Sequence, residues 1–484
     1  MRKLIIPVLL CVLSACSEPP VAVSPDAISI ESSIDQLSDR FEWAKEQALA
    51  YAHEEGDSVG LWYEAALPNR EAFCMRDVSH QALGAHFLGL DEHTRNMLFR
   101  FARNISEGKD WCSFWEINRM DEPAPVDYRD DKAFWYNLPA NFDVLDASYR
   151  MYLWTGDLAY VEHPVFLEFY ERTVSDYVAA WDLDAEVIVD RQRYMNRETF
   201  NLEDPYEYAR GIPSYHEGNQ GSTQLGIDLL AFQVAAYRSY AAILEHKGQP
   251  ARAKDYLSRA VRVSNLINEV FWNEETEQYA DLLQTDGELA MGGGMLTYAL
   301  YNDAIFMPDR ANKTALTLMQ REPSNIEIRS HYPEVLFKYG MFGEALDILM
   351  QLSADGTPRR EYPEVSFAVI GAITTGLMGL TPIDKGIGTL SRIPNEADHV
   401  SLRQFQHRGI VANLTHEGQS SSTLSVESGG KLYWRAMFNG DHPELAIDGK
   451  RLSAVRTTDQ LGNPISYIEI DLFPNDIVTI SVPE

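Results

Sequence analysis

The sequence predicts a mainly α-helical protein, a toroid of helical hairpins followed by a small antiparallel β-sandwich. From residue 34 onward, segments with helical apolar spacing follow one another with short turns between most of them. No strand–helix alternation is evident, which argues against a Rossmann fold or a triosephosphate-isomerase barrel. After Pro382 the sequence changes to short β-rich runs separated by turn signals. These observations divide the chain into a helical domain, 34–385, and a β domain, 386–484.

The first fifteen residues are expected to be a bacterial lipoprotein signal peptide. Two basic residues precede the apolar run Leu4–Leu13, which is too short to span a membrane. Residues 13–16, Leu-Ser-Ala-Cys, match the lipobox, so we expect cleavage before Cys16 and lipidation of its thiol. The alternative is an ordinary secretory signal that is cut nearby. Ser17 favours the outer membrane, on its periplasmic or surface face, and 16–33 is expected to be a flexible tether.

Composition restricts the possible partners. The 484 residues carry a formal charge of −31, with 45% hydrophobic and 11% aromatic residues. Such a chain can form a large core, and it repels nucleic acid and anionic lipid, so DNA and RNA are excluded as partners. No later segment is apolar enough to span a membrane, and we therefore expect membrane contact only through the N-terminal lipid. The sequence does not indicate an oligomeric state.

Two cysteines remain after the signal peptide and the lipidated residue. Cys74 and Cys112 both lie in aromatic-rich loops of a chain that is expected to enter an oxidising compartment. A disulfide between them and two separately buried thiols are both consistent with this pattern. No His/Cys group has zinc spacing, so we expect neither a metal nor a cofactor.

The helical segments can be assigned one by one. Leu37, Phe41 and Ala44 begin an apolar stripe in the first of them, and Pro139 and Gly156 suit the start and end of the fourth. A turn at 247–250 joins one hairpin. The expected helices are Ile34–His53, Val78–Leu90, Asp91–Ser106, Asn137–Asp157, Glu162–Trp181, Thr223–His246, Ala251–Phe271, Gly294–Tyr301, Arg310–Gln320, Pro333–Lys338, Phe342–Leu352 and Ser366–Leu380.

The expected strands are short and bounded by turn residues such as Asn439-Gly440 and Asp448-Gly449. They are Ile410–Leu414, Thr423–Val426, Lys431–Phe438, Ala446–Ile447, Ile465–Ile470 and Ile477–Val482.

Polar segments with aromatic neighbours precede several of the expected inner helices. They are Arg70–Leu90, Ser214–Ser222, His331–Val335 and Glu361–Val365. In a toroid of hairpins the inner helices run parallel, so that the loops before them open on one face. We therefore expect these segments to form the rim of one pocket.

The chain resembles the six-hairpin glycosidases, most closely the α-L-rhamnosidase type. The resemblance is carried by Phe134–Asp157, Thr223–Asp281, Phe342–Leu352 and Ser366–Pro382, and covers about Ile34–Pro382. It implies an (α/α)6 barrel closed by a C-terminal β domain, and glycoside hydrolysis with inversion. The rhamnosidase type has Arg-Asp-Glu where this chain has Arg76-Asp77-Val78, and it commonly has large β domains before the barrel.

Inverting hydrolysis requires a protonated carboxyl group and an ionised one, about 6.5–9.5 Å apart. Asp77 and Glu217 are the alternative acids, although Asp77 can also cap a helix or pair with Arg76. Glu364 is the favoured base because Pro363 places it in the first turn of a helix, where the helix dipole keeps a carboxylate ionised. Glu361 is the second choice for the base.

Aromatic and planar polar side chains in the same loops are expected to bind sugar. The alternative for each aromatic side chain is a place in the core. The arginines could bind an acidic glycan, and their alternative is pairing with neighbouring carboxylates. The expected substrate-binding residues are Arg70, Arg76, Tyr63, Trp135, Tyr136, Asn137, Tyr215, His216, Asn219, Gln220, His331, Glu334 and Arg360, with Trp62, Arg129 and Tyr362 as further candidates.

The predicted function is an inverting exo-glycosidase that releases a terminal sugar, of the rhamnose type or a uronic acid, from an oligosaccharide or polysaccharide. One alternative is a polysaccharide lyase on a helical toroid, which would use Tyr215-His216 or His331-Tyr332. The other is a lipid-anchored glycan-binding protein without catalytic activity.

Overall fold

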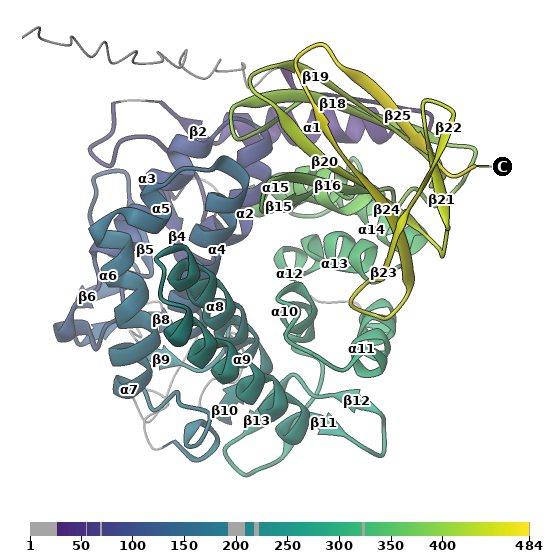
Figure 1. Ribbon diagram of the computed structural model, residues 1–484. Coiled ribbons are helices and arrows are strands. Elements are labelled where there is room, and N and C mark those ends of the chain that lie inside the picture. Colours follow the sequence, from purple (N-terminus) through teal and green to yellow (C-terminus); the bar gives the residue numbers. More distant parts are fainter. Residues whose placement is uncertain are drawn as a thin grey trace, which may run out of the picture.

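The computed structural model describes residues 27–54, 56–67, 70–191, 209–216, 222–321 and 325–483. It confirms a mainly helical chain that ends in β-sheet (Figure 1). The helices are α1 (Leu37–Ala50), α2 (Met75–Phe87), α3 (Asp91–Arg103), α4 (Pro139–Thr155), α5 (Ala159–Glu162), α6 (Pro164–Arg172), α7 (Val178–Ala180), α8 (Ile227–His246), α9 (Pro250–Val270), α10 (Leu296–Tyr301), α11 (Pro308–Gln320), α12 (Ile326–Ser330), α13 (Tyr332–Lys338), α14 (Phe342–Leu352) and α15 (Pro363–Gly371).

Local sequence signals set the ends of several helices. Pro139, Pro250 and Pro363 each begin a helix, where the missing N–H is not needed. Gly156 ends α4 with a φ of 70°, which glycine adopts without strain. α6 and α15 both continue through a π-helical turn, at Thr173–Tyr177 and Ala372–Leu377. The expected helix at Thr223 starts later, because strand β10 (Thr223–Gly226) pairs with β13 (Leu282–Gln284) before α8 begins.

Contacts between helices follow chain order. Helix α2 packs against α4, α4 against α8, α8 against α10, and α10 against α13, and α15 packs against α2. The remaining longer helices lie against these: α1 on α15, α3 on α2, α9 on α8, α11 on α10 and α14 on α13. Figure 1 shows this succession, from α2 through α8 to α13.

The contact between α2 and α15 is unusually close. A Cβ on Gly84 of α2 would lie 2.2 Å from the Phe367 carbonyl oxygen of α15. Only glycine therefore fits at this point. Both candidate catalytic carboxylates lie in the first turns of these helices, on the N-terminal side of this contact.

Short strand pairs occur in the loops of the helical part. They are β2 (Ala52–His53) with β3 (Trp62–Tyr63), β4 (Ala72–Cys74) with β5 (Glu116–Asn118), β6 (Tyr128–Asp130) with β7 (Ala133–Phe134), β8 (Tyr136–Asn137) with β9 (Arg210–Ile212), β11 (Trp272–Asn273) with β12 (Gln278–Tyr279), and β13 with β14 (Leu289–Ala290).

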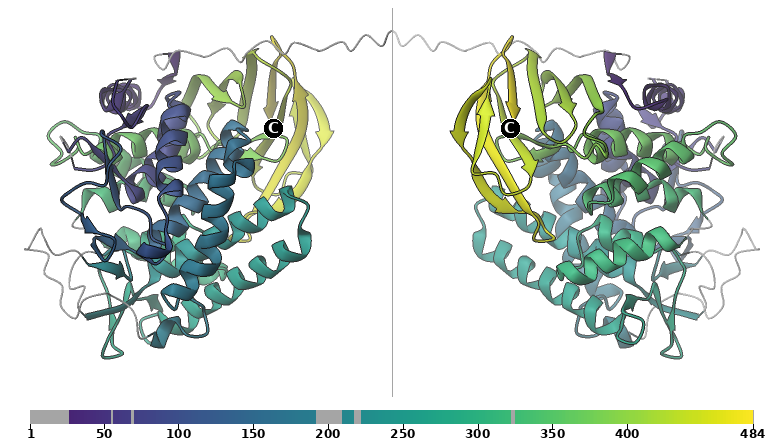
Figure 2. Two further views of the ribbon diagram at one scale, coloured as in Figure 1. Left: turned by 90° about the vertical axis from the view of Figure 1, so that its left-hand side faces the viewer. Right: turned by 90° about the vertical axis from the view of Figure 1, so that its right-hand side faces the viewer.

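The C-terminal strands lie together at one side of the helices (Figure 2). Within the described residues they form one sheet of order β1-β17-β18-β19-β25-β21-β22 and another of order β15-β16-β20-β24-β23. The strands are β1 (Ser29–Ser32), β15 (Thr381–Ile383), β16 (Gly386–Leu390), β17 (His399–His407), β18 (Ile410–Glu417), β19 (Ser421–Ser428), β20 (Leu432–Asn439), β21 (Glu444–Ile447), β22 (Lys450–Ser453), β23 (Val455–Thr458), β24 (Pro464–Leu472) and β25 (Ile477–Ser481).

Two details of this β region correct the sequence predictions. Strand β16 pairs with β20 in parallel, so the region is not purely antiparallel. Strand β1 pairs antiparallel with β17, with Ser29 opposite Arg403 and Ser32 opposite Val400. The last part of the expected tether, 16–33, is thus a strand of the C-terminal sheet. Pairing with β17 provides hydrogen-bond partners for the backbone N–H and C=O groups of this short segment, which cannot form a core of its own.

Apolar side chains of the helices and of both sheets belong to one hydrophobic core. Strand β20 alternates buried and half-buried residues, as expected for a sheet with one face in the core. Among the helices of the described residues, none combines the length and apolar character needed to cross a bilayer.

Candidate active site

The first carboxylate of the site lies where a strand runs directly into a helix. Strand β4 ends at Cys74, which is extended and precedes the first residue of α2. Asp77 lies in the first turn of α2 and is 1% exposed. Its Oδ1 accepts a hydrogen bond from Arg76 Nε at 3.0 Å, and its Oδ2 accepts one from the Tyr362 hydroxyl at 2.9 Å.

The environment of Asp77 favours the protonated acid. Burial raises the pKa of Asp77 to about 7, and the carboxylates of Glu364 and Glu327 act in the same direction. Arg76 and the Tyr362 hydroxyl lower this pKa but do not offset the burial. Asp77 can therefore hold a proton near neutral pH, as a general acid must.

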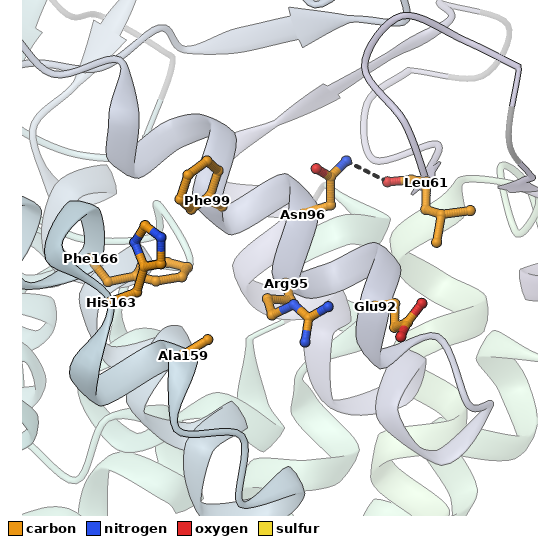
Figure 3. A pocket seen from close by; sticks show the side chains of 8 residues that line it. All are labelled: Leu61, Glu92, Arg95, Asn96, Phe99, Ala159, His163 and Phe166. Carbon is orange, nitrogen blue, oxygen red and sulfur yellow. Dashed lines mark hydrogen bonds between the residues drawn. The ribbon is translucent and has the colours of Figure 1, made fainter. Parts of the chain in front are cut away.

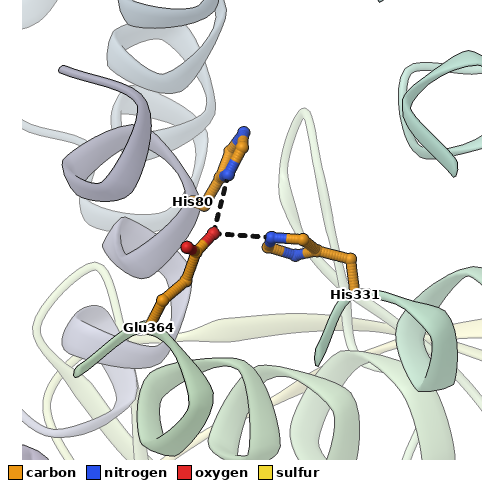
Figure 4. A group of neighbouring side chains, drawn as sticks. All are labelled: His80, His331 and Glu364. Carbon is orange, nitrogen blue, oxygen red and sulfur yellow. Dashed lines mark hydrogen bonds and ion pairs between the residues drawn. The ribbon is translucent and has the colours of Figure 1, made fainter. Parts of the chain in front are cut away.

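The second carboxylate, Glu364, lies in the first turn of α15 and is also 1% exposed. Its Oε1 lies 2.6 Å from His331 Nε2 and 2.8 Å from His80 Nδ1, so both rings are directed at one oxygen (Figure 4). Burial opposes ionisation, but these two histidines outweigh it and hold the pKa of Glu364 well below its usual range. No donor among the described residues reaches its other oxygen, Oε2.

A third buried carboxylate, Asp143 of α4, extends this cluster. Its Oδ2 lies 3.1 Å from His80 Nε2 and accepts a hydrogen bond from the Tyr215 hydroxyl at 3.0 Å. Burial lowers the pKa of His80, but Asp143 and Glu364 outweigh it and raise this pKa to about 9. The imidazole therefore carries a proton on each nitrogen at neutral pH.

Aromatic rings enclose the charged groups. The rings of Phe232, Tyr298 and Tyr301 lie 5.3–6.0 Å from that of His80, and His331 is 4.7 Å away. Such walls exclude water and strengthen the electrostatic interactions inside.

Arg76 connects the cluster to a further acid. Its guanidinium binds Glu327 Oε2 at 2.9 Å in addition to Asp77, and Arg359 binds Glu327 Oε1 at 3.2 Å. Its guanidinium also lies over the Tyr215 ring, 5.7 Å from the centroid. Arg76 thus orients the acid through its hydrogen bond to Asp77, and the ion pair with Glu327 holds Arg76 in place.

The structure brings together a subset of the residues expected from the sequence: Asp77, Glu364, Arg76, Tyr215, His331 and Tyr362. Sequence reasoning missed His80, Asp143 and Glu327. The sequence did contain a signal for two of them. His80 is a polar residue in an apolar helix, three positions after Asp77, and Asp143 is a polar residue within the apolar stretch of α4.

Other expected site residues lie elsewhere. Glu361 is exposed, and Arg360 pairs with Asp355 at 2.7 Å and covers Trp43. Tyr63 is fully buried and hydrogen-bonded to Thr94. Arg360 and Tyr63 therefore have partners outside the carboxylate cluster.

The aromatic platform expected at Tyr136 is also core. Its ring is fully buried, and its hydroxyl is bound to Asn141 and Met75. Trp135 is half-buried and donates its Nε1 hydrogen to Asn137 Oδ1 at 2.6 Å. Asn137 in turn donates to the Ser214 carbonyl, so these two residues support the segment that carries Tyr215.

The other described residues that were expected to contact substrate have partners outside the carboxylate cluster. Arg70 pairs with Glu116 at 3.0 Å and Asp127 at 3.3 Å, and the exposed Arg129 pairs with Asp130. Trp62 is fully buried and stacks on His53. His216 is half-buried, and its backbone N–H binds Ser214 Oγ. Glu217, Asn219, Gln220 and Cys16 lie outside the described residues.

Of the two alternatives for the cysteines, the structure shows two separate thiols and no disulfide between them. Cys74 and Cys112 are both free, buried thiols. Cys74 lies opposite Glu116 in the β4–β5 pair and donates its thiol hydrogen to Asp77 Oδ1 at 3.7 Å. Burial raises the pKa of both thiols, which keeps them protonated and unreactive.

Two pockets outside this cluster are lined in part by polar side chains that already have partners. A pocket of about 400 Å³ lies between α3 and the start of α6, beside Phe99, Phe166 and Asn96 (Figure 3). Asn96 donates to the Val59 and Leu61 carbonyls, and Arg95 pairs with Asp157 at 2.6 Å. Glu334 lines a different pocket, of about 450 Å³, together with Arg150 and Lys338.

Among the described residues, one group has donors close enough to hold a metal ion: the relevant atoms of His80, His331 and Glu364 lie within 4.8 Å of one another. However, both ring nitrogens contact Oε1 directly at hydrogen-bond distance, and His80 Nε2 faces Asp143. A hydrogen on His80 Nδ1 and one on His331 Nε2 account for both contacts with Oε1. These side chains therefore fit hydrogen bonding better than metal coordination.

Comparison by sequence finds no matching family model and no matching curated protein. Comparison by structure finds the α-L-rhamnosidase from Dictyoglumus thermophilum, with a TM-score of 0.59 at 11% identity over 94% of this chain and 50% of that one. The GH78 family rhamnosidase of Bacillus sp. GL1 matches with a TM-score of 0.56 at 13% identity, over 83% and 41% of the two chains. A sialidase matches with 0.55 at 10% identity, over 91% and 41%.

This chain thus spans between 41% and 50% of the length of these three proteins. The TM-scores show similarity of fold. At identities this low, activity and substrate have to be argued from the site itself. The chain shares its fold with these two rhamnosidases.

Proposed function

We propose that the protein is an inverting glycoside hydrolase in which Asp77 is the general acid and Glu364 the general base. The observation that carries the proposal is a pair of buried carboxylates, in the first turns of two contacting helices, whose pKa values are displaced in opposite directions. Pairs of this kind divide the acid and base roles of hydrolysis.

The scaffold we propose is an (α/α)6 toroid. The contact succession runs from α2 through α4, α8 and α10 to α13, then from α13 to the π-helical continuation of α15 at Ala372–Leu377, and from α15 back to α2, which supports the toroid. In this arrangement α2 and α15 are adjacent inner helices.

In the proposed reaction, protonated Asp77 donates its proton to the glycosidic oxygen as the bond to the leaving group breaks. Glu364 Oε2 accepts a proton from the water that attacks the anomeric carbon on the opposite face. The positions of Oε1 and Oε2 suit this role, because histidines occupy the first oxygen and no described donor occupies the second. A covalent sugar intermediate is not formed.

We propose an exo-acting enzyme and favour a neutral, rhamnose-type terminal sugar over a uronic acid. Each arginine considered for binding an acidic glycan pairs with a carboxylate: Arg70 with Glu116, Arg76 with Asp77, Arg129 with Asp130, and Arg360 with Asp355. A second anion at these guanidinium groups would have to displace an existing partner.

The lyase mechanism finds less support. It would use Tyr215-His216 or His331-Tyr332, but burial raises the pKa of Tyr215 well above its usual value and that of Tyr332 to about 12. The Tyr215 hydroxyl also donates to Asp143. His331 is likewise engaged with Glu364.

The decisive experiment measures hydrolysis of aryl glycosides and oligosaccharides by the wild type, Asp77→Asn, Glu364→Gln and Glu361→Gln. Glu364→Gln should lower turnover by about three orders of magnitude or more, because base catalysis and water positioning are both lost. Asp77→Asn should impair substrates with poor leaving groups far more than activated aryl glycosides. Glu361→Gln, in the same segment but exposed, is the matched control.

The product configuration tests inversion. Proton NMR of the first-formed sugar should show the anomer opposite to that of the substrate. Retained configuration, or rescue of Glu364→Gln by azide with retention, would contradict the mechanism. Glycan binding without turnover in wild type and variants alike would favour the non-catalytic alternative.

We also propose that lipid on Cys16 anchors the mature chain in the bacterial cell envelope, at the outer membrane. Support comes from the lipobox at residues 13–16.

A further inference from the structure

The two oxygens of Glu364 have different environments although they belong to one carboxylate. Oε1 is contacted by His331 Nε2 at 2.6 Å and by His80 Nδ1 at 2.8 Å (Figure 4). Oε2 is buried and has no partner among the described residues. A buried acceptor without a partner costs free energy, which indicates that another group binds there.

We propose that His80 and His331 act as positioning residues that hold Oε1 and thereby direct Oε2 of Glu364 toward the reacting water. This inference rests on the role of Glu364 as the base. Neither histidine needs to touch substrate. Their effect is on the orientation and charge of the carboxylate that does.

The direction of the hydrogen bonds follows from the groups at each end. His80 faces one carboxylate at Nδ1 and another, Asp143, at Nε2. Glu364 is ionised and only accepts hydrogen bonds, so Nδ1 of His80 must carry hydrogen. Nε2 lies 3.1 Å from Asp143 Oδ2 in an ion-pair contact, which favours hydrogen on this nitrogen as well. The ring is then an imidazolium, whose positive charge offsets part of the charge of the two carboxylates.

Asp143 fixes His80 in this state. The Tyr215 hydroxyl donates to Asp143 Oδ2, which is the oxygen that also faces His80. The result is a chain of contacts, Tyr215–Asp143–His80–Glu364–His331, that joins α2, α4, α15 and the segments before α8 and α13. A carboxylate held from several elements has little freedom to rotate, as a general base requires.

Other groups face the same space and set its total charge. They are Asp77 and Arg76 at the start of α2, Glu327 of α12, and the phenols Tyr298, Tyr301 and Tyr362. Arg76 is paired with Asp77 and Glu327 and therefore does not replace His80 as the cation beside Glu364.

The test compares His80→Gln and His331→Gln with His86→Gln. His86 is a matched control, because it lies on the same helix, is buried, and contacts a carboxylate, Asp91, at 2.8 Å. Loss of His80 or His331 should lower kcat with little change in KM. It should also move the acid limb of the pH profile up by about one to two pH units, because a charged hydrogen bond to Glu364 is lost. His86→Gln should leave this limb in place.

A second measurement does not depend on activity. In ¹⁵N-histidine NMR at pH 7.5, both nitrogens of His80 should be protonated, with the signal assigned by its absence in His80→Gln. Glu364→Gln should make His80 lose a proton at a lower pH, whereas Glu361→Gln should not.

These readouts separate the possible failures. A neutral His80 at pH 7.5, or an acid limb that does not move in His80→Gln, would overturn the proposal. Turnover that is lost on chelation and restored by a divalent metal would also overturn it, because a metal would then join the three side chains. A protonated His80 in a protein that hydrolyses no glycoside would support the held carboxylate and refute the proposed function.

Discussion

Replacing Gly84 by alanine should destabilise the protein, although alanine is the better helix former. The new Cβ would lie 2.2 Å from the Phe367 carbonyl oxygen, whereas ordinary contact begins near 3.4 Å. Helices α2 and α15 would therefore have to separate by about 1 Å. Overpacking of this size costs about 1–3 kcal/mol, against a gain of at most about 1 kcal/mol from helix propensity.

Gly371→Ala is the matched control for this substitution. Gly371 lies on α15 in the same helix pair, but its Cβ would meet only the Leu83 side chain, whose nearest atom, Cδ2, is 3.7 Å away. This substitution should be neutral or stabilise by about 0.5–1 kcal/mol, because it removes flexibility from the unfolded chain without a clash.

Urea denaturation monitored by circular dichroism would give both free energies of unfolding. Gly84→Ala should also reduce turnover about 100-fold, since a 1 Å displacement of α15 moves Glu364 relative to Asp77. Unfolding midpoints that match the wild type for Gly84→Ala, or that fall equally for both variants, would refute the reasoning.

Three further predictions concern single groups. Because burial raises the folded pKa of Asp77 to about 7, the folded state binds its proton more tightly than the unfolded chain does. The unfolding free energy should therefore fall as pH rises from about 4 to 7, and this fall should be smaller in Asp77→Asn; equal slopes would contradict it. Thiol titration of a chain that begins at residue 17 should detect both Cys74 and Cys112 after denaturation without reductant, and neither before it. Cys16→Ser should leave the membrane fraction while keeping its activity, and continued membrane association would count against the lipid anchor.

The sequence could locate the two carboxylates because their positions are local properties. Pro363 begins a helix and so places Glu364 in a first turn, and the polar segment before an apolar helix places Asp77 in the same way. Helix starts of this kind are readable from residue types alone. The order of the helices and the change to strands after Pro382 could also be predicted, because periodicity and turn residues are local too.

The partners of these carboxylates could not be predicted, because they depend on which helices touch. His80 and Asp143 lie in apolar helices, where a single polar residue is usually a core residue with a local partner. Their contact across α2, α4 and α15 depends on packing, including the close approach at Gly84. Similarly, only the fold shows that Tyr63 and Tyr136 are buried in the core.

The pairing of β1 with β17 has a consequence for how this protein can be shortened. β1 occupies the outer position beside β17, so it covers backbone groups that would otherwise form an open sheet edge. An uncovered edge is a template for strand addition between molecules. A version trimmed at residue 34, where the helical domain was expected to begin, would keep every helix and both candidate catalytic carboxylates. It would nevertheless expose β17, and we expect it to self-associate through that strand, whereas a version that begins at residue 27 should stay dispersed.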